Sequence, residues 1–528
     1  MSDHPFIIGT RGSDLALWQA NYVKEQLKEI GINTELKIIK TSGDKDRSSP
    51  FKSMAGQGFF TKTIEQELLN GTIDIAVHSH KDLETTPTKG LKIAAVSSRG
   101  DCRDILIINK NSVDHKNPLS ITNNAVLGTS SPRRRAQVRF LREDITLEEL
   151  RGNVPTRLEK LYNGQYDAII LAKAGIERLN IDISQFVSFS LDPLEFIPAP
   201  AQGALAIQIK EDDKELEKIV KQLNNKEAEK MINVERTALN LLRGGCQLPF
   251  GAYSFIENDK IECRAVLDDP DSEELKRIHF SFNKNSSEKD MARKLVDTLR
   301  DKTDKSVFIS KEYNSENLFF KRMKNIGIET SGFSLIETKT VNPETIPQTD
   351  RVFFTSPNAI KHFLEIADNT HKNIPFDVMG KGTKETLNDY GYEAEFSGEG
   401  LKTSEISNRY KAFLQKQDSK SILFPISDIS KRRFQKELKE DLTIYEIVVY
   451  KTETKSDITI PDCDVYVLTS PSNVDSLFKN SQIDLKQKQF IAIGETTAKR
   501  LKKFNIKELK TAYRPDMMSL ADEVTAVQ

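Results

Sequence analysis

The sequence predicts an α/β protein with several domains arranged in two halves. Short apolar runs typical of strands alternate with helical patterns through most of the 528 residues, and this alternation favours βα units with largely parallel sheets. The length is also far more than a single domain of roughly 150 residues requires. Because the alternation restarts near residue 305, we expect one multidomain half before that point and another after it.

The first block has the order of elements expected of an open α/β sheet. Short apolar runs predict strands over residues 6–10, 34–40 and 73–78. Between them, apolar residues recur at helical spacing over residues 15–30 and 62–69. The block therefore starts as strand, helix, strand, helix, strand.

The rest of the first half is predicted to hold a second α/β block, a crossing segment and a smaller domain. The second block covers residues 105–191, and the proline-rich residues 193–200 lead back to the first block. A helical stretch over residues 214–242 precedes residues 252–282, whose alternation favours an antiparallel sheet. Residues 41–58 are polar without periodicity, so we expect a surface loop that acts as a lid.

The second half begins with a predicted strand over residues 307–310 and contains a short sequence that occurs twice, called here the internal echo. The letters FTSPN at residues 354–358 return as LTSPSN at residues 468–473, each time after an apolar run. We therefore expect two similar α/β lobes.

The composition excludes several classes of protein. With 77 Lys plus Arg against 78 Asp plus Glu, the formal net charge is −1, so the chain has no overall field for nucleic acid and any anion site must be a local cluster. No apolar run approaches the ~18 residues of a membrane helix, and we expect a cytoplasmic protein with no membrane partner and no obligatory protein partner. The four cysteines lie far apart, which disfavours disulfides and a cysteine zinc site.

Polar residues end the strand predicted over 73–78 and are the first candidates for chemistry. His78, His80 and Asp82 alternate and would share one face, as metal ligands do. Alternatively, Asp82 beside the cation Lys81 could handle protons and stabilise a cationic intermediate. A solvated strand end is the third interpretation, and the residues alone leave all three open.

Arginines gather after several predicted strands and favour binding of carboxylate or phosphate groups. Residues 128–135 place hydroxyls, backbone N–H groups and three consecutive arginines at a predicted helix start. Further arginines follow strand-like runs at Arg11, Arg151, Arg157 and Arg178. The phosphate loop of nucleotide-binding proteins is absent from the sequence. Solvated helix ends remain the alternative for one or two of these arginines.

Cys246 is the cysteine whose sequence setting suggests reactivity. It follows a helical pattern, and Gly244 and Gly245 leave room for a group to approach its sulfur. The alternative is the usual role of a lone cysteine, a small buried residue without chemistry.

Six motifs of the first half together resemble hydroxymethylbilane synthase, also called porphobilinogen deaminase. They are GTRGSDLALWQ (9–19), AVHSHKD (76–82), GTSSPRR (128–134), RGNVPTR (151–157), AQGA (201–204) and GGCQLP (244–249). The resemblance implies two α/β domains like those of periplasmic binding proteins, at about 1–100 with 196–219 and 101–195. It also implies a small α+β domain over 220–305.

The same resemblance implies how the site is built. A dipyrromethane cofactor would be attached to Cys246 through a thioether, and four porphobilinogen units would be polymerised on it with loss of ammonia. Asp82 and Lys81 would be catalytic, and the cofactor would be held by Cys246, Asp82, Lys81, Ser130, Ser131, Arg133 and Arg134. Substrate carboxylates and rings would contact Arg11, Ser13, Phe60, Thr129, Arg151, Arg157, Arg178 and Gln202. Gln57 replaces a common lysine in the expected lid.

Five shorter motifs of the second half are similar to uroporphyrinogen-III synthase. They are FFTSPNA (353–359), ILFP (422–425), VVYKT (448–452), LTSPS (468–472) and IGETTA (493–498). The similarity implies lobes at about 306–342 with 453–528 and at 343–452. It also implies that hydroxymethylbilane is cyclised, with inversion of its last ring, without a cofactor.

Within this second half, Tyr450 would assist loss of the substrate hydroxyl. Ser356, Ser470, Thr496 and Thr497 would surround substrate carboxylates with hydroxyls and N–H groups. For each Thr-Ser-Pro sequence, a helix N-cap followed by Pro in the first turn is the alternative.

We therefore interpret residues 1–305 and 306–528 as the two halves of a bifunctional tetrapyrrole-biosynthesis enzyme. It would take porphobilinogen and hydroxymethylbilane as substrates and use no metal. The competing interpretations are a deaminase with an inactive second half, a two-lobed anion-binding protein without chemistry, and a metal hydrolase using His78, His80 and Asp82.

Overall fold

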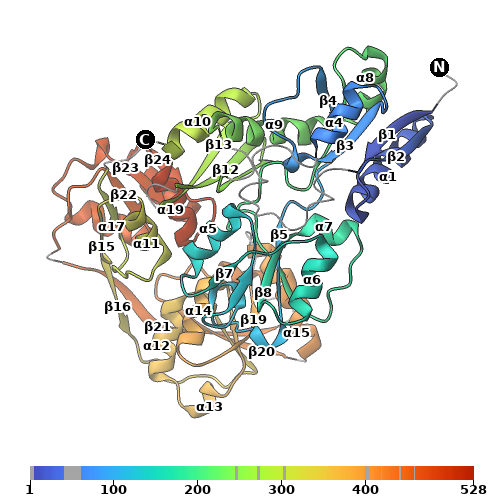
Figure 1. Ribbon diagram of the computed structural model, residues 1–528. Coiled ribbons are helices and arrows are strands. Elements are labelled where there is room, and N and C mark those ends of the chain that lie inside the picture. The colour runs from blue at the N-terminus through green and yellow to red at the C-terminus, as the bar shows by residue number, and fades with distance from the viewer. Residues whose placement is uncertain are drawn as a thin grey trace. The chain divides into compact units, whose positions relative to one another are not determined.

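The computed structural model describes residues 5–40, 61–243, 248–269, 274–300, 305–398, 403–417, 419–438, 442–456 and 458–527. The chain forms two compact units, residues 304–524 and residues 1–303 with 525–528. The sheets and helices of both are mixed α/β, as predicted (Figure 1).

The first sheet of the first unit has the strand order β2-β1-β3-β10-β4. Its strands are β1 (Phe6–Thr10), β2 (Thr34–Ile38), β3 (Ile75–Ser79), β4 (Leu91–Val96) and β10 (Leu205–Lys210). Helices α1 (Asp14–Glu29) and α4 (Lys62–Leu69) lie between its strands in sequence, and α4 has the predicted bounds. Strand β10 runs antiparallel to β3 and β4, so the sheet is mixed and not wholly parallel.

The second sheet of this unit repeats that plan with the order β7-β6-β8-β5-β9. It contains β5 (Asp104–Ile108), β6 (Val126–Gly128), β7 (Thr146–Glu148), β8 (Ala168–Ala172) and β9 (Val187–Ser190), with helices α5 (Pro132–Leu141), α6 (Val154–Tyr162) and α7 (Lys173–Arg178). Here β5 is the reversed strand. Apolar side chains pack on both faces of the sheet.

A three-stranded antiparallel sheet completes the unit and confirms the prediction for residues 252–282. It is formed by β11 (Phe250–Glu257), β12 (Lys260–Asp269) and β13 (Glu274–Asn283), and α9 (Lys226–Leu241) and α10 (Glu288–Arg300) pack against it. The helical stretch predicted over 214–242 is wrong as a single element. It divides into α8 (Lys214–Val220), a 3-10 turn and α9, because the Asn225 side chain accepts a hydrogen bond from Ala228 N–H and starts a new helix.

The second unit contains two sheets. The parallel sheet β15-β14-β22-β23-β24 is formed by β14 (Val307–Ile309), β15 (Thr330–Gly332), β22 (Val465–Leu468), β23 (Gln489–Ala492) and β24 (Leu509–Thr511). The other, β16-β21-β20-β17-β18-β19, is formed by β16 (Ile336–Thr340), β17 (Arg351–Phe354), β18 (Phe376–Val378), β19 (Ala394–Ser397), β20 (Ser421–Ser427) and β21 (Thr443–Thr454). Strands β16 and β21 of this sheet are antiparallel and lie side by side in Figure 1.

Helices flank both sheets of the second unit. They are α11 (Leu318–Asn325), α12 (Pro357–Ile366), α13 (Asn369–Lys372), α14 (Lys381–Asp389), α15 (Thr403–Gln417), α16 (Arg433–Leu438), α17 (Pro471–Asn480), α18 (Glu495–Lys502) and α19 (Met517–Thr525). Both Thr-Ser-Pro sequences connect a buried strand to a helix, β17 to α12 and β22 to α17. The predicted internal echo is therefore a repeated strand-turn-helix unit.

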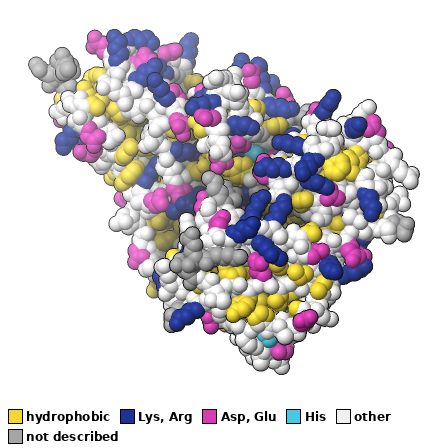
Figure 2. All heavy atoms as spheres, turned by 180° about the vertical axis from the view of Figure 1, so that it is seen from behind, with side chains coloured by type: hydrophobic (Ala, Val, Ile, Leu, Met, Phe, Trp, Pro, Cys, Tyr) yellow, Lys and Arg dark blue, Asp and Glu magenta, His cyan; other side chains and the backbone are white. Residues whose placement is uncertain are grey.

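Charged side chains of both signs cover the surface, as the balanced composition requires. Figure 2 shows Lys and Arg side chains gathered locally on one face, with Asp and Glu scattered among them. None of the described helices has the length and apolar character needed to span a membrane.

Candidate active sites

Asp82 lies in a 3-10 turn, His80–Asp82, that follows strand β3 directly. Its carboxylate is exposed, and the described residues give it no hydrogen bond. Two cations are its electrostatic neighbours. Burial lowers the pKa of Lys81, and the charge of Asp82 acts against this decrease. Burial and the charge of Arg134 lower the pKa of Arg157 to about 10, and Asp82 again acts in the opposite direction. The structure thus brings Lys81, Asp82 and Arg157 together at the end of a strand.

Asp104, at the start of β5, organises the two arginines predicted to hold a cofactor. Its buried carboxylate accepts hydrogen bonds from Arg133 Nη1 at 2.8 Å and from Arg134 Nη2 at 2.7 Å. Burial alone would raise the pKa of Asp104, but the two guanidinium groups hold it well below its ordinary value. Two cations therefore share one buried anion, which leaves a net positive charge.

Arg133 and Arg134 are themselves only 4% and 6% exposed. Arg133 also donates to the Ile197 carbonyl and Arg134 to the Ile170 carbonyl, both within 2.9 Å. The Nε of Arg133 is buried without a hydrogen-bond partner among the described residues. Both guanidinium groups are thus held in place by the protein.

Gln202 connects Asp104 to the turn that carries Asp82. Its Nε2 donates to Asp104 Oδ1 at 3.0 Å, and its Oε1 accepts from Lys81 Nζ at 3.3 Å. It lies where the backbone segments at Gly100 and Gly203 approach each other closely, and Gly100 N–H donates a hydrogen bond to the Gly203 carbonyl. A Cβ at Gly203, whose φ is +93°, would stand 2.7 Å from the Gly100 oxygen, so only glycine fits there.

Of the other predicted residues of the first unit, Arg178 lies beside this centre. Arg178 donates to the Gly203 carbonyl at 2.6 Å and lies over the Trp18 ring, and burial lowers its pKa. Arg151 is partly exposed and pairs with Glu149 at 2.8 Å. Arg11 follows β1, and Ser13 occupies the N-cap position of α1.

Two loops that carry predicted hydroxyls are tied to each other. Thr129 N–H donates to the Glu148 carbonyl, and Ser130 Oγ bonds both the N–H and the carbonyl of Leu150 at 3.0 Å. Ser131 is the N-cap residue of α5. Phe60, Cys246, Gln57 and the predicted lid lie outside the described residues.

Asp104, Glu235 and Arg236 contact the segments of the predicted site, and sequence reasoning missed them. Glu235 of α9 is fully buried and accepts hydrogen bonds from Arg99 Nη1 at 2.6 Å and Ala201 N–H at 2.7 Å. A sequence signal for it existed. Glu235 lies at helical spacing on the same apolar face as Met231 and Ala238, where a charge requires a buried partner.

The metal interpretation receives no geometric support from His78 and His80. Burial lowers the pKa of His78 to about 4 and that of His80 to about 3. His78 Nε2 lies 3.2 Å from Gln208 Oε1, whereas neither ring nitrogen of His80 has a partner among the described residues. The described residues contain no group of three or more His, Cys, Asp and Glu side chains placed to hold a metal ion.

In the second unit, Ser356 and Ser470 are both helix N-caps. Ser356 Oγ accepts from Ala359 N–H and Ser470 Oγ from Asn473 N–H, with Pro following each serine. The N-cap alternative is therefore confirmed for both. Thr496 and Thr497 lie in the first turn of α18, which follows the neighbouring strand β23.

Tyr450, near the end of β21, lies beside Ser356 and His362. Its hydroxyl is 3.3 Å from Ser356 Oγ. Its ring stacks on the imidazole of His362, which is 2% exposed.

The hydrogen bonds around His362 assign its protons. Thr340 Oγ1 lies 2.5 Å from Glu365 Oε2, and the pKa of Glu365 is lowered by that hydrogen bond. Thr340 must therefore donate to the carboxylate and accept from His362 Nδ1, 2.8 Å away. Burial lowers the pKa of His362, so the ring is neutral and its Nε2 accepts from Thr338 at 2.8 Å.

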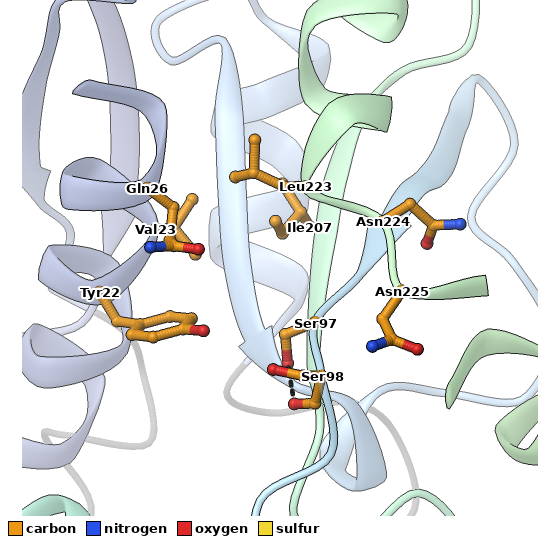
Figure 3. Close-up of a pocket in the computed structure, with 9 residues that line it drawn as sticks. All are labelled: Tyr22, Val23, Gln26, Ser97, Ser98, Ile207, Leu223, Asn224 and Asn225. Atoms are coloured by element: carbon orange, nitrogen blue, oxygen red, sulfur yellow. Dashed lines mark hydrogen bonds between the residues drawn. The ribbon is translucent and has the colours of Figure 1, made fainter. Parts of the chain in front are cut away.

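The described residues of the first unit also line a small cavity of about 180 Å³ (Figure 3). Tyr22, Val23 and Gln26 of α1 border it on one side, and Asn224 and Asn225 before α9 on the other. No predicted site residue lines the cavity, so it is separate from the site around Asp82.

Three family models match the chain. "Porphobilinogen deaminase, dipyromethane cofactor binding domain" matches residues 6–218, and "Porphobilinogen deaminase, C-terminal domain" matches residues 229–303. "Uroporphyrinogen-III synthase HemD" matches residues 319–522.

Curated relatives agree with the first two matches. A porphobilinogen deaminase of Helicobacter acinonychis is 43% identical over 283 residues, which are 53% of this chain and 90% of the relative. A probable porphobilinogen deaminase of Methanocaldococcus jannaschii is 44% identical over 262 residues, 49% of this chain and 87% of the relative.

Among solved structures, a mutant uroporphyrinogen III synthase of Thermus thermophilus matches 42% of this chain and 98% of its own. Its sequence identity is 13% and its TM-score 0.26. The sequence matches are decisive: the chain belongs to the porphobilinogen deaminase family in its first half and carries a uroporphyrinogen-III synthase domain in its second, which makes it a bifunctional enzyme of haem biosynthesis.

Proposed function

We propose that Asp82 is the catalytic carboxylate with which the first unit joins four porphobilinogen units into hydroxymethylbilane. The observation that carries this proposal is an exposed carboxylate without a hydrogen bond from the described residues, flanked by Lys81 and Arg157. Such a carboxylate is available to pyrrole N–H groups.

The chemistry requires a negative charge at that place. When the protonated amine of porphobilinogen leaves as ammonia, the C–N bond breaks with its electron pair on nitrogen, and the remaining pyrrole unit is cationic. Asp82 stabilises that cation and accepts a hydrogen bond from the pyrrole N–H. After the new C–C bond forms, Asp82 is placed to accept the proton that the attacked ring carbon must lose.

We propose that dipyrromethane is bound covalently to Cys246 and supplies the anchored pyrrole to which the first substrate unit is joined. The described residues fit such a polycarboxylate. Arg133 and Arg134 share a single carboxylate, and Nε of Arg133 has no partner among the described residues. Ser130, Ser131, Lys81 and Asp82 complete the set that would hold it.

The other cations bind the acetate and propionate groups of the growing chain. Arg11, Arg151, Arg157 and Arg178 each offer a guanidinium group, which matches carboxylate geometry. Ser13, Thr129 and Gln202 add polar contacts, and Phe60 stacks on a pyrrole ring. Residues 1–100 with 196–219, 101–195 and 220–305 act as three domains around this site.

For the second unit we propose that Tyr450 donates a proton to the departing hydroxyl of hydroxymethylbilane. Ser356 Oγ accepts from the Ala359 N–H, so its own proton is available for the Tyr450 oxygen and the tyrosine proton for the substrate. Ser356 and Ser470 bind carboxylates through backbone N–H groups, and Thr496 and Thr497 through hydroxyls and N–H groups. The lobes are residues 306–342 with 453–528 and residues 343–452.

We also propose that the enzyme works in the cytoplasm, without an obligatory protein partner. Among the described residues, Cys102, Cys263 and Cys463 form no disulfide, which suits a reducing compartment.

One experiment tests the central proposal. Protein from cells that supply porphobilinogen is analysed by intact mass spectrometry, and its reaction with Ehrlich's reagent is recorded. We expect one dipyrromethane per chain, lost in Cys246→Ser and kept in Cys102→Ser. An unmodified wild-type mass, or an adduct that persists in Cys246→Ser, would contradict the attachment.

A further inference from the structure

Arg236 of α9 holds the backbone of the turn that carries Asp82. Its Nη1 donates to the carbonyls of His80 at 2.9 Å and Leu83 at 3.3 Å. Its Nη2 donates to the carbonyls of Leu83 at 3.3 Å and Glu84 at 2.7 Å. One guanidinium group thus binds three carbonyls that begin and follow the 3-10 turn.

This support matters because the described residues do not hold the Asp82 side chain itself. The described residues offer its carboxylate no hydrogen bond, so its place in the site depends on the backbone beneath it. Within the turn that backbone is held by His80 N–H to the Ala204 carbonyl and by a long Leu83 N–H to His80 carbonyl contact of 3.4 Å. Arg236 adds four bonds to these two.

The neighbouring residue on α9 fixes the other side of the site. Glu235 binds Arg99 and the Ala201 N–H, next to Gln202. Gln202 in turn contacts Lys81 and Asp104. Two consecutive residues of one helix therefore hold both segments that form the site.

We propose that Arg236 is a positioning residue for porphobilinogen deamination, acting through the Asp82 turn. The inference rests on the proposed role of Asp82. Loss of the guanidinium group lets the turn shift, and a displacement of about 1 Å between a catalytic group and its substrate costs on the order of 100-fold in rate. Substrate carboxylates are bound elsewhere, so KM changes little.

The test compares Arg236→Met with Lys230→Met in the full chain carrying its cofactor. Lys230 is a matched control, because it is also on α9 and also donates to a backbone carbonyl, that of Lys284 at 2.6 Å, away from Asp82. Porphobilinogen consumption, cofactor content and thermal unfolding are measured for each. We expect kcat to fall about 10- to 100-fold in Arg236→Met with KM within about twofold, and near wild-type kcat in Lys230→Met.

Two further variants separate positioning from general stability. Arg236→Lys keeps the charge but cannot reach all three carbonyls, so its kcat should lie between wild type and Arg236→Met. In an Asp82→Asn background, Arg236→Met should cost less than about threefold, because the residue acts through Asp82. Equal losses in both backgrounds, or a kcat for Arg236→Met equal to that of Lys230→Met, would overturn the proposal.

The outcome for Asp82 is read independently. If Asp82→Asn alone keeps wild-type turnover, the proposed catalytic role fails, and a loss in Arg236→Met would then show that Arg236 acts by another route. If Asp82→Asn collapses turnover while both Arg236 variants match the control, only the positioning role fails.

Discussion

The imidazole of His362 lies nearly flat against the ring of Tyr450, with ring centroids 5.1 Å apart and planes inclined by 21°. Thr338 and Thr340 hold that imidazole from strand β16, which pairs with the end of β21 where Tyr450 lies. The tyrosine ring therefore has a support whose own orientation is fixed.

We predict that Tyr450→Phe and His362→Leu both lower the fraction of uroporphyrinogen III formed from hydroxymethylbilane. The first removes the proton donor, and the second removes the surface that orients it. His371→Leu is the control, since His371 is a buried histidine of the same unit that bonds Asp368 and not Tyr450. The oxidised isomers are separated by chromatography. Wild-type isomer ratios in Tyr450→Phe would remove the tyrosine from the mechanism.

Asp82→Asn is expected to reduce deaminase turnover about 100- to 10,000-fold, because an amide can neither balance positive charge nor take up the proton. Asp82→Glu should retain more activity. Asp182→Asn changes an aspartate away from this turn and should be neutral. Ammonia release is measured at saturating porphobilinogen. Equal activity of Asp82→Asn and Asp182→Asn would exclude a catalytic role.

Arg151→Leu should affect cofactor assembly or chain elongation alone, whereas Arg133→Leu should also affect the stability of the fold. Arg151 is partly exposed, so its loss should slow cofactor assembly or chain elongation without changing the unfolding temperature. Arg133 is buried against Asp104, and its loss should also destabilise the fold, by about 1–3 kcal/mol, since Arg134 still pairs with the carboxylate. Arg139→Leu, which breaks an exposed pair with Asp268, should do neither. Thermal unfolding and assays of bound pyrrole distinguish the three.

His80→Met should stabilise the protein in mild acid. The folded pKa of His80 is about 3, whereas an unfolded histidine titrates near 6.5. As the pH falls from about 6.5 towards 3, the unfolded chain gains a proton that the folded chain does not, so stability falls by up to about 1.4 kcal/mol per pH unit for this residue. His78 contributes in the same direction down to about pH 4.

The measurement is the urea midpoint of wild type and His80→Met between pH 7 and pH 5. The variant should have the higher midpoint at pH 5 and the shallower pH dependence. A methionine also removes two ring nitrogens that lack partners among the described residues, so a gain at pH 7 is expected as well. Parallel pH profiles would mean that the pKa of His80 is the same in the folded and the unfolded protein.

A chain ending at Lys305 should consume porphobilinogen at a rate comparable to that of the full chain but yield the type I isomer. Hydroxymethylbilane released into water closes without ring inversion, and only an enzyme gives type III. The full chain should yield mainly type III. If the full chain, with both units folded, also yields only type I, the second unit has the fold without the activity.

Strand and helix positions could be predicted from the sequence where the spacing of apolar residues and the amino-acid composition favour the same element. The helix over Lys62–Leu69 and the antiparallel sheet β11-β12-β13 were predicted because their apolar spacing is regular. The reversed strands β10 and β5 were not, because a buried strand has the same composition in either direction. The break near Asn225 was also not predicted, because a single N-cap residue does not interrupt the helical spacing of the apolar residues around it.

The sequence suggested which residues form the site, but not the hydrogen bonds that connect them. The motifs and the resemblance they carry pointed to Asp82, Lys81 and the arginines, but they could not show that Asp104 holds Arg133 and Arg134, because the three are brought together only by the packing of α5 on the second sheet. Arg236 was missed for a similar reason. Its role depends on carbonyl groups, which every residue has and no sequence pattern reveals.

The two compact units, residues 1–303 with 525–528 and residues 304–524, are parts of one polypeptide, so a single gene sets the amounts of both. Separate enzymes can be made in unequal amounts, and an excess of the first would release its unstable product faster than the second could use it. Here every ribosome that completes the chain makes one copy of each. The ratio of the two activities is therefore set by their turnover numbers alone and stays the same when transcription rises or falls.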